Sequence, residues 1–293
     1  MSDTAPAPSR RLDLPRGRGL ELGGRPRVMG VLNLTPDSFF APSRAPEPEQ
    51  AASQARRLID EGADVLDIGG ESTRPGSRPV DPQEQCRRVL PILEAVRRDW
   101  DGPISIDTSS ALVARRAWES GADIVNDVGA GRLDPAMTAL AAESGLPIIL
   151  MHMQGTPETM QENPTYGDVV AEVRDFLLER AAALERAGVR RERILLDPGI
   201  GFGKRLEHNL RLIARIGDLR AAGYPVVLGV SRKSFLGRLL DGEPPAELLE
   251  ASLAVAAWAA AAGVEMVRVH DVKATLRVAR VTAAIAAARA PNA

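Results

Sequence analysis

The sequence predicts a (β/α)8 barrel preceded by a short N-terminal β-hairpin. Three observations indicate this fold class. Eight short apolar runs recur along the chain, and each is continuous, as in strands that are buried on both faces of a parallel sheet. A helical stretch follows each run, which is typical of β-α units. Several of these helices end in glycine, as in residues 61–64 (Glu-Gly-Ala-Asp), where glycine permits a left-handed cap before the next strand.

The hairpin comes first in the chain, because residues 12–14 and 20–22 alternate apolar and polar side chains across a turn with Pro and Gly. The eight strands are expected at 28–32, 65–68, 104–106, 124–125, 147–151, 194–196, 225–228 and 266–269. The helices are expected at 49–61, 82–98, 109–120, 135–143, 167–187, 206–216, 244–262 and 272–288. Eight such units match a closed barrel, and an open doubly wound sheet is the alternative topology.

Composition narrows the class of protein. The chain has 293 residues, of which 44% are hydrophobic, and its net charge of −2 argues against a nucleic-acid partner. The single Cys86 excludes an intramolecular disulfide. With no apolar run of membrane length and no signal-peptide core, we expect a cytoplasmic protein without a membrane partner. Residues 1–11, rich in Ala, Pro and Ser, are expected to form a disordered tail, and residues 12–293 a single domain.

Basic residues are distributed unevenly. Only Lys204, Lys233 and Lys273 are lysines, and the other 34 of the 37 basic residues are arginines. A chain that uses arginine by default and keeps a lysine can need a compact ammonium group at that position. Two of the three lysines lie in motifs described below, which makes them candidate site residues.

Polar side chains lie at the carboxyl-terminal ends of the expected strands, where the active site of a (β/α)8 barrel forms. Each has a plain structural interpretation as well. Asp107 and Asp271 could be helix caps, Asn126 could hold a turn, and His152 between two methionines fits a packed residue better than a metal ligand. Together they indicate a functional site at this end of the barrel, which we call the mouth. Its candidate residues are Asn33, Asp67, Asp107, Asn126, His152, Asp197, Lys233, Arg268 and His270.

Residues 195–204 (Leu-Leu-Asp-Pro-Gly-Ile-Gly-Phe-Gly-Lys) carry the strongest single motif. Asp197 follows an apolar run and begins a turn, in which glycines occupy every second position (199, 201 and 203). Glycine lets the backbone approach a partner closely. On its own, the segment suits either a flat, hydrogen-bonding ligand or an anionic one. The polar strand ends favour the flat ring here, because they place the anion near Asn33, Arg268 and His270, and Lys204 then has a supporting role.

The chemistry of the mouth divides in two. Asp107, Asn126 and Asp197 offer acceptors and amide donors to a flat heterocycle that carries N–H groups. Arg268 and His270 suit a phosphate-type anion, together with Asn33 and nearby Arg74. The sequence has no Gly-Lys-Ser/Thr phosphate loop and no His/Cys cluster with zinc spacing. A single Mg2+ held by Asn33 and substrate phosphates would be sufficient.

Taken together, these motifs resemble the dihydropteroate synthase family. The resemblance extends from Met29 to about Thr275 and rests on residues 29–39, 67–76, 105–108, 126–128, 151–157, 195–204, 231–234 and 268–271. It implies a reaction that joins 6-hydroxymethyl-7,8-dihydropterin diphosphate to 4-aminobenzoate and releases diphosphate. It also implies Mg2+ as cofactor, a homodimer, and inhibition by sulfonamides.

The resemblance also assigns roles to residues. It places the catalytic work on Asp107, Lys233 and Arg268. The pterin ring would be held by Asp107, Asn126, Asp197, Lys233 and Arg268. The metal would be held by Asn33, and the diphosphate by Arg268, His270 and Thr73. The aminobenzoate pocket would be shaped by Thr73, Arg74, Ser231 and Phe202.

Two positions depart from the family pattern. The family continues residues 35–39 with Ser-Asp-Gly-Gly, whereas this chain has Phe-Ala-Pro-Ser at 40–43, and Ile200 stands where phenylalanine is frequent. The altered first loop leaves open a pterin-binding paralogue with little synthase activity. A corrinoid-linked methyltransferase domain that binds methyltetrahydrofolate and a Schiff-base aldolase acting through Lys233 are further alternatives, and the aldolase is the weakest because the neighbours of Lys233 are polar.

Overall fold

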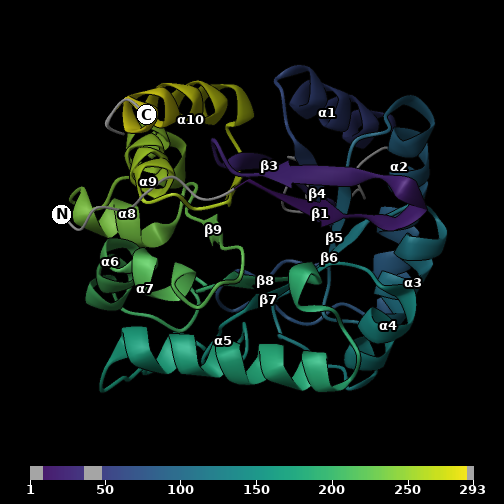
Figure 1. Ribbon diagram of the computed structural model, residues 1–293, viewed down its shortest axis with the longest axis horizontal. Coiled ribbons are helices and arrows are strands. Elements are labelled where there is room, and N and C mark those ends of the chain that lie inside the picture. The colour runs from purple at the N-terminus through teal and green to yellow at the C-terminus, as the bar shows by residue number, and fades with distance from the viewer. Residues whose placement is uncertain (1–8, 36–47, 289–293) are drawn as a thin grey trace.

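The computed structural model describes residues 9–35 and 48–288, and its core is a parallel barrel (Figure 1). Neighbouring strands are paired in the order β8-β7-β6-β5-β4-β3-β10-β9. A parallel bridge between Leu196 and Val226, with a 2.9 Å hydrogen bond from Leu196 N to Pro225 O, joins β8 to β9 and closes the ring. The strands are β3 (Arg27–Asn33), β4 (Val65–Gly69), β5 (Ile104–Asp107), β6 (Ile124–Asp127), β7 (Ile148–Met151), β8 (Ile194–Asp197), β9 (Val227–Gly229) and β10 (Met266–Val269).

Helices surround the barrel, and the predicted (β/α)8 fold is confirmed (Figure 1). They are α1 (Pro48–Asp60), α2 (Pro82–Asp99), α3 (Ala111–Glu119), α4 (Ala136–Ser144), α5 (Val169–Arg186), α6 (Leu206–Ala214), α7 (Ile216–Arg220), α8 (Ser234–Leu239), α9 (Leu249–Ala261) and α10 (Val272–Ala287). None of the helices in the described part of the chain combines the length and the apolar character that crossing a bilayer requires.

Several helices differ from the prediction. The helix expected at 244–262 begins at Leu249, after a separate 3-10 turn at Pro245–Glu247. The helix α3 begins at Ala111 instead of residue 109, because the Thr108 hydroxyl accepts the Ser110 amide and holds a turn before it. The helix expected at 206–216 ends at Ala214, and the separate helix α7 follows. The helix α8 was not predicted, because six residues are too few to show a helical period.

The hairpin is formed by β1 (Arg10–Asp13) and β2 (Gly19–Leu22), and it lies across the amino end of the barrel (Figure 1). Its β1 strand begins two residues earlier than the pattern suggested, while residues 1–8 of the expected tail are outside the described residues. Four hairpin leucines pack against the first inward-pointing residues of the barrel strands. The hairpin therefore covers the amino end of the barrel. The cluster consists of the hairpin residues Leu12, Leu14, Leu20 and Leu22 and the strand residues Met29, Val65, Ile124, Ile149, Leu195, Val227 and Met266.

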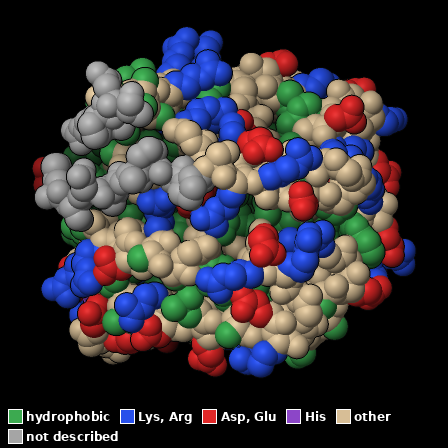
Figure 2. All heavy atoms as spheres, in the orientation of Figure 1, with side chains coloured by type: hydrophobic (Ala, Val, Ile, Leu, Met, Phe, Trp, Pro, Cys, Tyr) green, Lys and Arg blue, Asp and Glu red, His purple; other side chains and the backbone are tan. Residues whose placement is uncertain are grey.

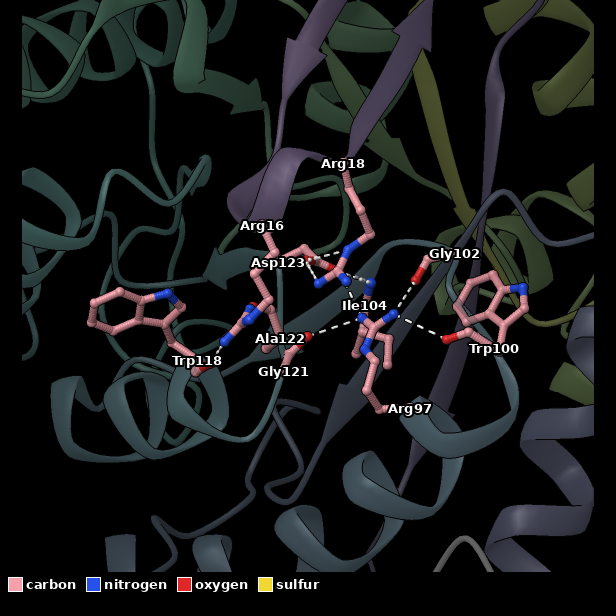
Figure 3. A network of polar contacts seen from close by, with 10 residues as sticks. All are labelled: Arg16, Arg18, Arg97, Trp100, Gly102, Ile104, Trp118, Gly121, Ala122 and Asp123. Atoms are coloured by element: carbon pink, nitrogen blue, oxygen red, sulfur yellow. Dashed lines mark hydrogen bonds and ion pairs between the residues drawn. The ribbon is translucent and has the colours of Figure 1, made fainter.

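A network around Asp123 fastens the hairpin to the barrel (Figure 3). The Asp123 carboxylate, which is fully buried, accepts from Arg18 at 2.5 Å, from Arg97 at 2.7 Å and from the Ile104 amide at 3.0 Å. Arg16, in the turn of the hairpin, donates to the carbonyl groups of Trp118 and Ala122. Because every charge here has a partner, the network stabilises the closed end without leaving a buried ion alone.

The same arrangement recurs at two other strand starts. Asp64 accepts from the Val28 amide at 2.8 Å and pairs with Arg25, and Glu265 accepts from the Val226 amide at 2.8 Å and pairs with Arg220. The Gly-x-acid sequence that ends several helices thus supplies both a helix cap and a carboxylate that ties the new strand to the preceding one. Over the side of the molecule in Figure 2, acidic and basic side chains are intermixed, as expected for a net charge of −2.

Candidate active site

The opposite, carboxyl-terminal end of the barrel brings Asp67, Asp107 and Arg268 into one cluster. Arg268 Nε donates to Asp67 Oδ2 at 2.6 Å, and Arg268 Nη2 donates to Asp107 Oδ2 at 2.7 Å. Asp67 was noted at a strand end without a role, and the structure shows that it is fully buried beneath the other two side chains. Burial opposes the charge of Arg268, but Asp67 and Asp107 more than compensate and raise its pKa, so the guanidinium stays charged.

Asn126 joins this cluster and is oriented by it. Its Nδ2 donates to Asp67 Oδ2 at 3.2 Å. A carboxylate bound to a guanidinium accepts rather than donates, so the amide group of Asn126 must point its nitrogen at Asp67 and leave its oxygen for another donor. In the described residues, Asp107 Oδ1 is buried and has no hydrogen-bond partner. The site therefore presents acceptors on Asp107 and Asn126 that await N–H groups.

Asp197 and Lys233 occupy the facing side of the mouth. Asp197 is buried, and its Oδ1 accepts the Gly199 amide at 2.7 Å. A Cβ placed on Gly229 would lie 3.9 Å from Asp197 Oδ2 and 3.7 Å from Lys233 Nζ, so glycine leaves the space between these groups open. Lys233 Nζ donates to the Ile200 carbonyl and lies 4.6 Å from the centre of the Phe202 ring. Lys233 is thus a donor beside a set of acceptors.

Burial sets the protonation behaviour of these groups. It raises the pKa of Asp107 to about 7, and the nearby charge of Arg268 only partly opposes this rise. It also raises the pKa of Asp197, against the charge of Lys233. For Lys233, burial lowers the pKa to about 8, with Asp197 acting in the other direction. Groups with pKa values this close to neutrality are typical of active sites.

The glycine-rich segment has a different role from the one expected. A Cβ on Gly199 would lie 1.9 Å from the His152 carbonyl oxygen, and one on Gly203 would lie 2.7 Å from the Gln154 carbonyl oxygen. These glycines therefore permit close contact with the loop after β7, and they do not face a ligand. Only Gly201 faces a site residue, since its Cβ would lie 3.2 Å from Lys233 Cδ.

Lys204 holds this segment together from inside. It is 2% exposed, and its Nζ lies 2.9 Å from His152 Nδ1, 2.9 Å from the Gly199 carbonyl and 3.0 Å from the Phe202 carbonyl. Burial lowers the pKa of His152 to about 2, so this ring stays neutral and accepts from Lys204. The interpretation of His152 as a packed residue fits its contact with Phe176, at 4.9 Å between ring centres.

His270, Ser231 and Arg74 lie at the rim of the mouth. The His270 amide donates to Ser231 Oγ at 3.2 Å, and His270 Nδ1 lies 3.1 Å from the same oxygen, so Ser231 is occupied with His270. Arg74 is exposed on the loop after β4, and its charge acts on His270. Thr73, one residue earlier, is half-buried. Burial, followed by the charge of Arg268, lowers the pKa of His270 to about 4, so Arg74 supplies the positive charge among these three residues and suits an anionic group.

The interpretation of Asp271 as a helix cap is wrong. Its side chain makes no capping hydrogen bond at the start of α10, and instead its two oxygens accept from Arg232 at 2.8 and 2.9 Å. Arg232 adopts a φ of 55° and also donates to the carbonyl groups of Pro245 and Ala246. This pair joins the loop that carries Ser231 and Lys233 to the end of the strand that carries Arg268 and His270.

Asn33 is the candidate metal ligand. A Cβ on Gly69 would lie 3.7 Å from Asn33 Oδ1 and 3.3 Å from Asp107 Cβ, so Asn33 lies beside the Asp107 cluster. The described residues contain no group of three or more His, Cys, Asp or Glu side chains that could hold a metal. One amide oxygen fits Mg2+, which takes one or two protein ligands when substrate phosphates supply the others.

The altered first loop, with Phe-Ala-Pro-Ser at 40–43, lies outside the described residues. Ile200 is fully buried in the barrel core, so the exchange at this position is an apolar packing change.

Comparison with known proteins supports the same interpretation. Residues 29–270 match the family model described as pterin binding enzyme. The chain is 43% identical to a dihydropteroate synthase of Synechocystis sp. over 97% of both chains, and 45% identical to that of Escherichia coli K12 over 94% of this chain and 96% of the other.

Solved structures agree with these relatives. A dihydropteroate synthase of Yersinia pestis, in complex with a sulfonamide drug, superimposes with a TM-score of 0.90 at 41% identity over 95% of this chain and all of the other. The Xanthomonas albilineans enzyme with 4-aminobenzoic acid gives 0.88 at 43% identity over 97% of this chain and all of the other. From its sequence, its barrel and the side chains at the mouth of that barrel, the chain belongs to the dihydropteroate synthase family of pterin-binding enzymes.

Proposed function

We propose that the chain catalyses the synthesis of 7,8-dihydropteroate in folate biosynthesis, from 6-hydroxymethyl-7,8-dihydropterin diphosphate and 4-aminobenzoate. The observation that carries this proposal is the set of acceptors on Asp107, Asn126 and Asp197 opposite the ammonium of Lys233. A pterin ring carries several N–H groups on one side and a carbonyl oxygen at C4. Its N–H groups would satisfy the acceptors, and Lys233 would donate to its oxygen or ring nitrogen.

The reaction breaks the C–O bond between the pterin methylene and the diphosphate, which leaves with the bonding electron pair. The aniline nitrogen of 4-aminobenzoate forms the new C–N bond and then loses a proton. An aniline is an adequate nucleophile without a strong base, so stabilising the departing charge matters most. Arg268, held by two carboxylates, and His270 at the rim would bind the departing diphosphate, and the Asp107 carboxylate would stabilise positive charge on the pterin.

Asn33 would hold Mg2+, which supplies positive charge to the diphosphate when it is bound. Thr73, Arg74 and Phe202 would shape the aminobenzoate pocket around the reacting methylene. Water must be excluded from this space, since it would capture the developing cation.

The experiment is a direct synthase assay. The purified chain is incubated with the pterin diphosphate, Mg2+ and 4-aminobenzoate, and dihydropteroate is measured by mass spectrometry, with omission of Mg2+ as the test of the metal. Product formation supports the proposal. Pterin binding by calorimetry without product would favour the non-catalytic paralogue, and binding of methyltetrahydrofolate without any use of diphosphate would favour the methyltransferase.

Two finer expectations accompany this function. The resemblance predicts a homodimer in solution, which sedimentation equilibrium checks. A cytoplasmic location is the second expectation, based on the single cysteine and on the lack of a membrane-length apolar run in the sequence, and cell fractionation checks it.

A further inference from the structure

The loop between β4 and α2, which carries Thr73 and Arg74, is closed at its base by a buried side-chain contact. Glu71 Oε1 accepts the Val80 amide at 2.7 Å, and Glu71 Oε2 accepts from Gln85 Nε2 at 3.2 Å. Gln85 Nε2 also donates to the Val80 carbonyl at 3.0 Å. The start of the loop, its end and the first turn of α2 are therefore joined through two side chains.

Gln85 extends this contact to the end of β5. Its Oε1 accepts from Thr108 Oγ1 at 3.0 Å, and Thr108 directly follows Asp107. The Thr108 oxygen already accepts the Ser110 amide, so its hydroxyl proton is free to go to Gln85. Gln85 is 3% exposed and uses both ends of its amide group, which is the reason that a polar side chain can be buried in α2.

Other contacts hold the remainder of the loop. Arg88 Nη1 donates to the Gly70 carbonyl at 3.0 Å, next to Glu71. At the tip, the Gly76 amide donates to the Pro157 carbonyl at 3.0 Å, which docks the loop on the segment after β7. Thr73 and Arg74 thus stand between an anchored base and an anchored tip.

We propose that Gln85 and Glu71 are positioning residues, which hold the loop bearing Thr73 and Arg74 at a fixed place relative to Asp107 so that the aryl amine can bind beside the pterin. This inference rests on the proposed synthase function. Neither side chain touches the Asp67–Arg268–Asp107 cluster through a hydrogen bond, so their effect is indirect. They act on the amine pocket through hydrogen bonds, and on the pterin acceptors only through the charge of Glu71, which is a minor cause of the raised pKa of Asp107 after burial, Arg268 and Asp67.

A residue swap tests this role against a merely structural one. Both oxygens of Glu71 accept a hydrogen bond, one from the Val80 amide and one from Gln85 Nε2. In Glu71→Gln only one acceptor remains at this position, so one of these two donors loses its partner. In Gln85→Glu, a buried carboxylate faces the half-buried carboxylate of Glu71, which is unfavourable unless one of them binds a proton. The double variant Glu71→Gln/Gln85→Glu restores a donor–acceptor pair and keeps an acceptor for Thr108 and for the Val80 amide. It also replaces the donor to the Val80 carbonyl with a carboxylate oxygen, so the rescue is partial.

We expect each single variant to raise KM for 4-aminobenzoate roughly tenfold, which is the loss typical of one hydrogen bond to a charged group. Calorimetric affinity for the pterin diphosphate, measured above pH 8 where Asp107 is ionised in every variant, should stay within about twofold of the original, because no hydrogen bond to a pterin acceptor changes. The double variant should have a KM between those of the single variants and that of the original chain. The matched control is Arg87→Gln, on the exposed face of the same helix, which should leave both values unchanged.

Unchanged KM in both single variants, or a double variant no better than the singles, would overturn the proposal. If the single variants do not fold, Thr108→Val removes the hydrogen bond between Thr108 and Gln85 instead. An unchanged KM for 4-aminobenzoate in Thr108→Val would also overturn the proposal. Hydrogen exchange of the amides of residues 72–79 gives a readout independent of catalysis: faster in the single variants and restored in the swap. If the unmodified chain makes no dihydropteroate, the synthase function fails, while the exchange pattern still decides on the positioning role.

Discussion

Arg268 and Asp107 meet across the mouth of the barrel with 2.7 Å between Nη2 and Oδ2, although 161 residues separate them in the chain. The second carboxylate on Arg268 comes from Asp67, at 2.6 Å. Two carboxylates around one guanidinium leave a net negative charge in a dry site. Burial then makes one of them, Asp107, bind a proton far more readily than an exposed aspartate, while Asp107 Oδ1 stays available to a ligand.

The first prediction concerns the acid limb of the pH–rate profile. With the pKa of Asp107 raised to about 7, its carboxylate is protonated below that pH and ionised above it. If the anion stabilises the pterin cation, kcat/KM should rise from pH 6 to pH 8. Asp107→Asn should lower kcat/KM and remove this limb. A limb near pH 7 that persists in the variant would assign it to another group.

The second prediction concerns Asp67, which touches both Arg268 and Asn126. Asp67→Asn removes the charge that these two donors share, so pterin affinity should fall by roughly tenfold or more in calorimetry. The negative charge of Asp67 also contributes to the high pKa of Asp107, so the acid limb should move to lower pH in this variant. Asp101→Asn, at an exposed carboxylate, is the control. Unchanged affinity together with an unmoved limb would refute the role of Asp67.

The third prediction concerns Lys233 and Asp197. Lys233→Ala or Asp197→Ala should reduce turnover by orders of magnitude without unfolding the chain, because both side chains face the open space beside Gly229. The pKa of Lys233, lowered to about 8 by burial, predicts that activity falls above that pH as the ammonium loses its proton. Near-normal turnover in either variant would show that the site is assigned wrongly.

Much of this site could be predicted from the sequence, because a closed barrel brings the ends of all its strands to one rim. Asp107, Asn126, Asp197 and Arg268 needed only the strand pattern to be placed together. Side-chain pairing was harder to predict. Asp271 has the position of a helix cap, and its actual partner, Arg232, lies 39 residues away in a loop whose course depends on barrel closure.

Gln85 was missed for a related reason. It lies on a helix whose other buried residues are apolar or cysteine, and a sequence offers no sign that one glutamine on such a helix turns inward. The glycines of residues 199–203 misled in the opposite way. Their spacing correctly indicated close approach, but the atoms that Gly199 and Gly203 approach belong to the loop after β7, and only Gly201 approaches the site residue Lys233. Close contact is readable from glycine, whereas the identity of the partner requires the fold.

The fourth prediction separates the two buried lysines. Lys204→Met should destabilise the chain by roughly 3 kcal/mol, because the variant leaves the Gly199 and Phe202 carbonyl groups and His152 Nδ1 without their buried donor. Urea denaturation measures the change. Lys233→Ala serves as the comparison, with a large loss of turnover and little loss of stability. The same order of stability loss in both variants would contradict the division of roles.

The last prediction concerns the closed end of the barrel, where Asp123 lies among Arg18, Arg97 and the Ile104 amide (Figure 3). Asp123→Ala leaves two half-buried guanidinium groups near each other without their carboxylate, and loss of one partner from a buried pair costs about 3–5 kcal/mol. Both arginines retain some solvent contact, so we expect a loss toward the lower end of this range in urea denaturation. Because this network lies at the opposite end from the mouth, KM for both substrates should stay unchanged in the folded variant. A changed KM with intact stability would mean that the hairpin influences the site through the barrel.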